Sequence, residues 1–179
     1  GSTSFLRAHK PQKFGDNMDN IRHTIVDTNR LYQPIMGFET GRVYSGIRGT
    51  SPVSMMNDAG EYEHIGTVEA GASFALVLNN LTAQSNINAA VFLYEEHLRK
   101  NVWPDYLKQH LIETPAINSL VLEQTTNEQI IPLTKLISNT DHKYSQVQNS
   151  DIDLQIITSD GHSYLYATKP LRDYLGTKN

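Results

Sequence analysis

Apolar and polar residues alternate along the first half of the chain, and this pattern predicts β-strands. Between Gly37 and Phe74 the sequence predicts a β-hairpin, because side chains separated by two positions lie on the same strand face. One face of the first strand is expected to carry Arg42, Tyr44, Gly46 and Arg48. The run Asn-Asp-Ala-Gly at 57–60 is a turn signal. A turn centred there would place Arg48 roughly opposite Glu69 on the returning strand.

Helical spacing predicts one helix on each side of this hairpin. In the first helix, Asp16 or Asp19 is expected to be the N-cap, and the helix runs to about Leu31 before Pro34. Its apolar stripe is expected to comprise Met18, Ile21, Ile25 and Val26. A second helix is expected from Ala72 to about residue 84.

The second half predicts further strands and helices. Segment 88–94 is short and apolar and predicts a central strand, and 95–111 predicts partly helical structure with Pro104 starting a new turn. Segment 126–138 fits a helix, although Pro132 predicts a break or kink. Strands are expected at 152–158 and 162–168, joined at Asp160-Gly161, a strong hairpin signal. The order of elements predicts an antiparallel α+β domain rather than βαβ units.

Composition narrows the class of protein. A chain of 179 residues is long enough for one domain with a hydrophobic core. Fifteen basic against nineteen acidic residues give a net charge of −4, which argues against a nucleic-acid or anionic-membrane surface. The sequence contains no apolar run long enough to span a bilayer. The absence of cysteine excludes disulfides, thiolate metal sites and a cysteine nucleophile.

Enzyme signatures are absent from the sequence. It contains no HExxH, no GxSxG, no glycine-rich phosphate loop and no CxxC. None of the seven histidines forms an i, i+4 pair, so a zinc site on one helix is not expected. A hydrolase or transferase with His9 or His64 as base would lack a recognisable nucleophile. The expectation is therefore a protein that is not an enzyme, with no catalytic residues, no metal and no cofactor.

The two arginines of the predicted hairpin, Arg42 and Arg48, allow two interpretations. They lie among glycines, which in a strand often mark close approach by a ligand or by another backbone. A guanidinium presents a fork of donors that fits a carboxylate, so these arginines are candidates for binding a ligand. Alternatively, they pair with Glu39 and Glu69 across the sheet and serve only the fold. Glu69 is in turn a candidate for receiving an amine.

Four runs of sequence resemble a known family. They are TSFLRAHKPQKFGD (3–16), GFETGRVYSGIRGTSPV (37–53), HIGTVEAGASF (64–74) and ATKPLRDYLG (167–176). These runs resemble Cache sensor domains, and more narrowly the double-Cache subgroup of bacterial chemoreceptors, sensor kinases and diguanylate cyclases. The resemblance covers roughly the first 75 residues and the last 15, and from Gln84 to about His162 it lies only in the order of elements.

The resemblance implies a PAS-like fold, with a central antiparallel sheet flanked by helices and a small ligand held against the sheet. It implies one sensory domain over residues 1–179, an excised fragment without the membrane-proximal helix and output domain. The positions that match the family's pocket, together with two neighbouring aromatic residues, are the ligand-binding candidates Arg7, His9, Phe38, Arg42, Tyr44, Arg48 and Glu69.

The resemblance further implies a periplasmic domain of a membrane-anchored bacterial chemoreceptor, which signals by conformational change. The expected ligand is a small organic acid or amino acid, and the expected assembly is a homodimer in the full receptor, without nucleic acid. The alternative is the sensor domain of a histidine kinase or diguanylate cyclase that recognises a protein partner rather than a small molecule.

Overall fold

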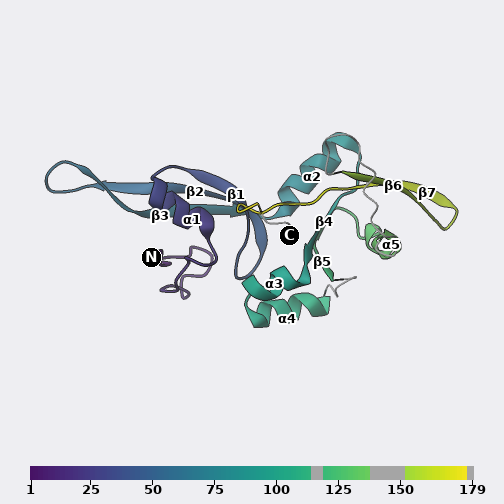
Figure 1. Cartoon of the computed structure of the whole chain (residues 1–179), viewed down its shortest axis with the longest axis horizontal. Coiled ribbons are helices and arrows are strands. Elements are labelled where there is room, and N and C mark those ends of the chain that lie inside the picture. Colours follow the sequence, from purple (N-terminus) through teal and green to yellow (C-terminus); the bar gives the residue numbers. More distant parts are fainter. Residues whose placement is uncertain (114–118, 138–151, 177–179) are drawn as a thin grey trace. The chain divides into compact units, whose positions relative to one another are not determined.

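The structure, a computed structural model, describes residues 1–113, 119–137 and 152–176 (Figure 1). These residues form two compact units. The first contains Gly1–Phe74, Asn101–Trp103 and the described residues that follow Arg172, and the second contains the described residues of 75–100 and 104–172. That residues 1–179 act as a single sensory domain stays a prediction.

The first unit is built on a three-stranded antiparallel sheet in the order β1-β2-β3 (Figure 1). The strands are β1 (Ile35–Thr40), β2 (Ser45–Met56) and β3 (Tyr62–Ala72). The predicted hairpin is present as β2 and β3, and the predicted turn at 57–60 joins them, with Gly60 at a φ of +81°. Strand β1 was not predicted.

The predicted strand face containing Arg42 and Tyr44 is wrong, because both residues lie between β1 and β2. The backbone N–H of Gly41 donates to the carbonyl of Tyr44 at 3.0 Å and closes a turn. The predicted register is also wrong by two residues: Arg48 lies opposite Gly71, and Glu69 lies opposite Thr50. A bulge between Val53 and Ser54 shifts the pairing by one residue; Gly66 lies opposite Val53, and a glycine within a strand is a sequence signal for such a bulge.

Helix α1 (His23–Leu31) lies against this sheet and begins later than predicted. Asp16 and Asp19 do not cap it, because the chain first turns at Met18, whose carbonyl accepts from the N–H groups of Ile21 and Arg22. Met18 and Ile21 are buried as expected, but they precede the helix.

The buried residues of α1 are threonines rather than an apolar stripe. Thr24 and Thr28 are both 0% exposed. The Thr28 hydroxyl shares a hydrogen bond of 2.6 Å with the hydroxyl of Thr50 on β2. The contact between this helix and the sheet is therefore polar, and it provides partners for buried charged groups.

The second unit alternates helices with two-stranded antiparallel sheets, β4-β5 and β6-β7. Its elements are α2 (Phe74–Ser85), β4 (Ala90–Tyr94), α3 (Glu95–Asn101), α4 (Pro104–Glu113), β5 (Leu120–Thr125), α5 (Ile130–Ile137), β6 (Asp153–Ser159) and β7 (His162–Thr168). Leu93 on β4 and Val121 on β5 are fully buried.

Most predicted elements of this unit are present. Pro104 begins α4 as expected. Asp160 and Gly161 join β6 to β7 with φ of 50° and 76°, the left-handed geometry of a tight hairpin turn. Pro132 lies in the first turn of α5, where a missing N–H removes no intrahelical bond, so the predicted break does not occur. Strand β5 was not predicted.

Antiparallel sheets with flanking helices confirm the α+β, PAS-like class. No helix among the described residues is long and apolar enough to cross a membrane.

Candidate functional site

Four charged side chains meet between the start of α1 and the sheet of the first unit. We call Arg22, Arg48, Glu39 and Glu69 the charge cluster. The side chains of Arg22, Arg48 and Glu39 are only 6%, 5% and 5% exposed, whereas that of Glu69 is 22% exposed. Two positive and two negative charges therefore balance, and Glu69 is the member nearest to solvent.

Strand pairing brings the cluster together. Glu39 lies opposite Gly46, and Arg48 lies two residues further along β2, so both side chains are on one sheet face. Glu69 lies opposite Thr50 and shares this face from β3. Arg22 immediately precedes α1 and closes the cluster from the helix side.

Both carboxylate oxygens of Glu39 accept hydrogen bonds. One of its oxygens accepts from the backbone N–H of Thr24 at 2.9 Å, and the other accepts from the Thr24 hydroxyl at 2.6 Å. Its carboxylate also lies 3.3 Å from Nε of Arg22. A buried carboxylate with these partners is held in place by the first turn of α1.

Glu69 is shared by the two arginines. Nη2 of Arg22 donates to its Oε2, and Nη1 of Arg48 lies 3.9 Å from its Oε1. Burial, offset by the charge of Glu69, lowers the pKa of Arg22. Among the described residues, Nε of Arg22 and Nε of Arg48 are buried without a hydrogen-bond partner. Nε of Arg22 nonetheless lies 3.3 Å from the Glu39 carboxylate, so of these two atoms it is Nε of Arg48 that the cluster leaves unused.

Tyr44 holds the Arg48 guanidinium from the connection between β1 and β2. Nη1 of Arg48 donates to the Tyr44 hydroxyl at 2.7 Å, and Nη2 donates to the Tyr44 carbonyl at 3.1 Å. The guanidinium lies 4.2 Å from the centre of the tyrosine ring. A Cβ at Gly71 would lie 2.2 Å from Nη1 of Arg48, so only glycine leaves room there.

The structure places the other predicted site residues outside the charge cluster. Arg7 forms a two-pronged ion pair with Asp16, at 2.7 and 2.8 Å. The Arg7 hydrogen bond, with a smaller contribution from the charge of Arg42, lowers the pKa of Asp16. Nη1 of Arg42 donates to the Asn101 carbonyl at 3.1 Å. His9 is exposed on the N-terminal segment.

Phe38 belongs to the core rather than to the cluster. It is 8% exposed and its ring centre lies 5.2 Å from that of Phe74. Three of the seven predicted residues, Tyr44, Arg48 and Glu69, are therefore brought together, and the other four are not.

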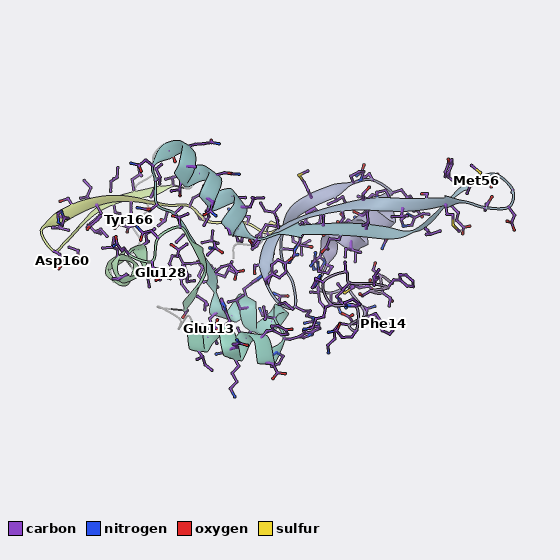
Figure 2. The ribbon with its side chains drawn as sticks, turned by 180° about the vertical axis from the view of Figure 1, so that it is seen from behind. Phe14, Met56, Glu113, Glu128, Asp160 and Tyr166 are labelled. Atoms are coloured by element: carbon purple, nitrogen blue, oxygen red, sulfur yellow. The ribbon has the colours of Figure 1, made fainter. Side chains whose placement is uncertain are left out.

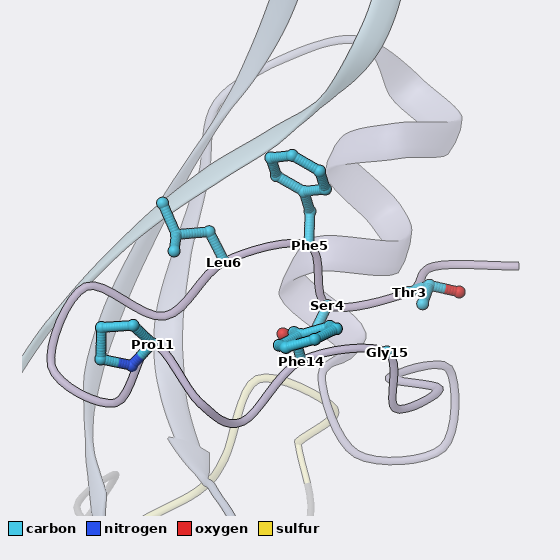
Figure 3. Close-up of a pocket in the computed structure, with 7 residues that line it drawn as sticks. All are labelled: Thr3, Ser4, Phe5, Leu6, Pro11, Phe14 and Gly15. Carbon is cyan, nitrogen blue, oxygen red and sulfur yellow. The ribbon is translucent and has the colours of Figure 1, made fainter.

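Two open cavities lie in the first unit. One, of about 560 Å³, is formed by the N-terminal segment, where the side chains of Phe5, Leu6 and Phe14 surround a shallow hollow (Figure 3). The other, of about 290 Å³, lies on the sheet beside Met36 and Val68. None of the predicted site residues lines either cavity.

Sequence reasoning missed Arg22 and Thr24. The sequence offered no signal for them, because Glu39 and Glu69 were already matched by Arg42 and Arg48, and Arg22 lies 47 residues from Glu69. Among the described residues, no group of three histidine, aspartate or glutamate side chains is placed to hold a metal ion.

Comparison with known proteins identifies the family. A family model described as the double sensory domain of two-component sensor kinases, dCache_3, matches residues 2–178. No curated protein and no solved structure matches the chain. The match spans nearly the whole chain and agrees with the α+β fold and with the resemblance of the four sequence runs. The chain therefore belongs to the double-Cache family of sensory domains.

Proposed function

We propose that this chain is the periplasmic ligand-binding domain of a membrane-anchored bacterial chemoreceptor. Its ligand is a small carboxylate-bearing metabolite, an organic acid or an amino acid, bound at the charge cluster. The observation that carries the proposal is that two buried arginines share one carboxylate, Glu69, which is also the most exposed member of the cluster.

A ligand carboxylate replaces Glu69 in this mechanism. Arg22 and Arg48 are almost fully buried and both face the Glu69 carboxylate, so a carboxylate that takes its place pairs with two guanidinium groups at once. Exchange of one carboxylate for another leaves the buried charge balanced, which avoids the cost of stranding a guanidinium. Glu69, released at the solvent side, regains hydration.

The surroundings of Glu69 favour a carboxylate ligand over an amine. An amine that approached Glu69 would meet the positive charges of Arg22 and Arg48 on the same carboxylate. Like charges at this distance repel, and burial strengthens the repulsion.

Exchange at Glu69 also gives a route for signalling. Glu69 belongs to β3 and Arg22 to the start of α1, so their ion pair ties the strand to the helix. A ligand that takes the place of Glu69 favours a state in which this tie is broken. The ligand shifts the balance of the two states only by its differential affinity for them.

A second candidate is the sensor domain of a histidine kinase or diguanylate cyclase that recognises a protein partner. Two observations favour it: the family description names sensor kinases, and the cluster is tightly packed, as the close approach at Gly71 indicates. In this candidate the cluster is structural and holds α1 to the sheet.

Thermal unfolding against a panel of small carboxylates, amino acids, amines and purines separates the two candidates. A ligand at 100 times its dissociation constant adds about 2.7 kcal/mol of stability. We expect a carboxylate to raise the midpoint of the wild type and of Arg99→Ala, a control on the surface of α3, but not of Arg48→Ala or Arg48→Lys. A carboxylate that still raises the midpoint of the Arg48 variants contradicts the proposed site. If no compound of the panel changes the midpoint of the folded proteins, the protein partner is favoured.

A further inference from the structure

The β2–β3 hairpin extends past the rest of its sheet. Strand β1 pairs only with residues 45–50 of β2, so the outer part of the hairpin is a two-stranded ribbon (Figure 1). We call residues 53–65 the hairpin arm; Met56 lies near its tip (Figure 2). Met55, Met56 and Tyr62 are 60%, 55% and 76% exposed. An apolar two-stranded ribbon is marginal in water and gains stability from a surface that covers it.

The hairpin arm is also acidic. Asp58, Glu61 and Glu63 are exposed on it, and residues 53–65 contain no lysine or arginine. The arm therefore presents apolar side chains beside three negative charges, a combination that suits a basic apolar surface.

The N-terminal segment of the same unit has the opposite character. We call residues 5–14 the N-terminal loop. Phe5, Leu6 and Phe14 are 92%, 65% and 68% exposed around its hollow (Figure 3). The loop contains Arg7, Lys10 and Lys13 and no acidic residue; Arg7 is paired with Asp16, so Lys10 and Lys13 give the loop its basic character.

This loop is held in a defined shape. Ser4 donates to the Asp16 carbonyl at 3.0 Å, and Gly15 donates to the Ser4 carbonyl at 2.7 Å. The ion pair between Arg7 and Asp16 also joins the two ends of the loop. A fixed loop loses little conformational entropy on binding.

We infer that the hairpin arm of one chain docks on the N-terminal loop of a second copy, and the reverse, in a two-fold symmetric dimer. Each chain carries two complementary surfaces, the apolar and acidic hairpin arm and the apolar and basic N-terminal loop. A two-fold axis lets the arm of each chain contact the loop of the other. This complementarity favours a second copy over an unrelated acidic protein or a membrane. The inference is independent of the ligand proposed for the charge cluster.

Charge reversal tests the dimer. We expect the full chain to sediment as a dimer at low salt and to dissociate as salt rises. The loop variant Lys10→Glu/Lys13→Glu and the arm variant Asp58→Lys/Glu61→Lys should each be monomeric, because their two surfaces then carry the same sign. Mixed in equal amounts, the two variants should form a heterodimer, because both contacts again join opposite charges.

A control matched to the loop variant carries the same change in net charge elsewhere. Lys100→Glu/Lys108→Glu lies on exposed positions of the second unit and should leave the dimer intact. Circular dichroism of every variant checks folding. Three results would overturn the inference: a wild type that stays monomeric, a dimer that survives both reversals, or variants that do not pair on mixing. Binding of monomeric wild type to anionic vesicles would also overturn it, in favour of a membrane surface.

Discussion

Replacing Gly71 by alanine would place a methyl group against the Arg48 guanidinium. The added Cβ would lie 2.2 Å from Nη1 of Arg48 and 3.1 Å from the Tyr44 hydroxyl. Ordinary contact begins near 3.4 Å, so the guanidinium must move by about 1 Å. Because Arg48 is only 5% exposed, it has no open space into which it could move freely.

The expected cost follows from the interactions of Arg48 that the methyl group disrupts. Moving the guanidinium breaks its 2.7 Å bond to the Tyr44 hydroxyl and disturbs its stacking on the tyrosine ring. A hydrogen bond from a charged donor contributes about 1.5–3 kcal/mol, and a cation–π contact about 1 kcal/mol. Alanine in place of glycine in a strand returns roughly 0.5–1 kcal/mol. We therefore expect Gly71→Ala to destabilise the first unit by about 2–3 kcal/mol.

The assay uses the single tryptophan of the chain. Trp103 belongs to the first unit, so its fluorescence during urea unfolding reports on that unit. Gly49→Ala is the matched control, since a Cβ at Gly49 on β2 meets nothing within 4 Å. We expect this control to change stability by no more than roughly 0.5–1 kcal/mol, in the stabilising direction.

Two results would refute this expectation. If Gly71→Ala unfolds at the same urea concentration as Gly49→Ala, the guanidinium is not fixed against Gly71. The second test places the alanine in an Arg48→Met background, where the planar charged group is gone. The cost of Gly71→Ala should then fall markedly, and an unchanged cost would show that the alanine acts through something other than Arg48.

Three further predictions concern contacts outside the cluster. Tyr174→Phe removes the 2.8 Å bond to Asp27 and should cost about 1 kcal/mol in the same urea assay. Burial first, and then Asp27, raises the pKa of Tyr174, so the wild type should lose stability as pH rises above 10, and the variant should lack that loss. The Arg7 hydrogen bond lowers the pKa of Asp16 below 3.8, so its contribution is complete above that pH and is lost as pH falls further. Asp16→Asn should accordingly unfold with a weaker acid dependence, and an identical acid titration would count against the ion pair. Gly161→Ala, at a φ of +76°, should cost about 1–2 kcal/mol, seen by circular dichroism as loosening of β6–β7.

Local signals in the sequence predicted local structure well. The turns at 57–60 and at Asp160-Gly161 were predicted correctly because their chemistry is contained within a few residues. The start of α1 was not, because the turn at Met18 uses backbone groups that the apolar spacing does not reveal. Strand β1 was hidden in the connection after Pro34, where its short alternation is interrupted by Gly37.

The charge cluster was predicted only in part for a different reason. Arg48 and Glu69 stood out because each lies near glycines in an alternating strand. Arg22 pairs with Glu69 across 47 residues, and a non-local pair leaves no periodic pattern. One residue of the two-residue error in register comes from the bulge at Val53. The other comes from the turn, because Met56 pairs with Tyr62 and the hairpin is therefore centred on Ala59 rather than between Asp58 and Ala59.

The central claim is that an external carboxylate takes the place of Glu69 on Arg22 and Arg48, and acetate tests it directly. In Glu69→Ala the two guanidinium groups lose their shared carboxylate. We would measure the thermal midpoint of this variant, of the wild type and of Glu95→Ala, a control on α3, in rising sodium acetate against sodium chloride of equal ionic strength. We predict that acetate raises the midpoint of Glu69→Ala well beyond chloride, and beyond its effect on the other two proteins. Equal responses in all three proteins would contradict the claim.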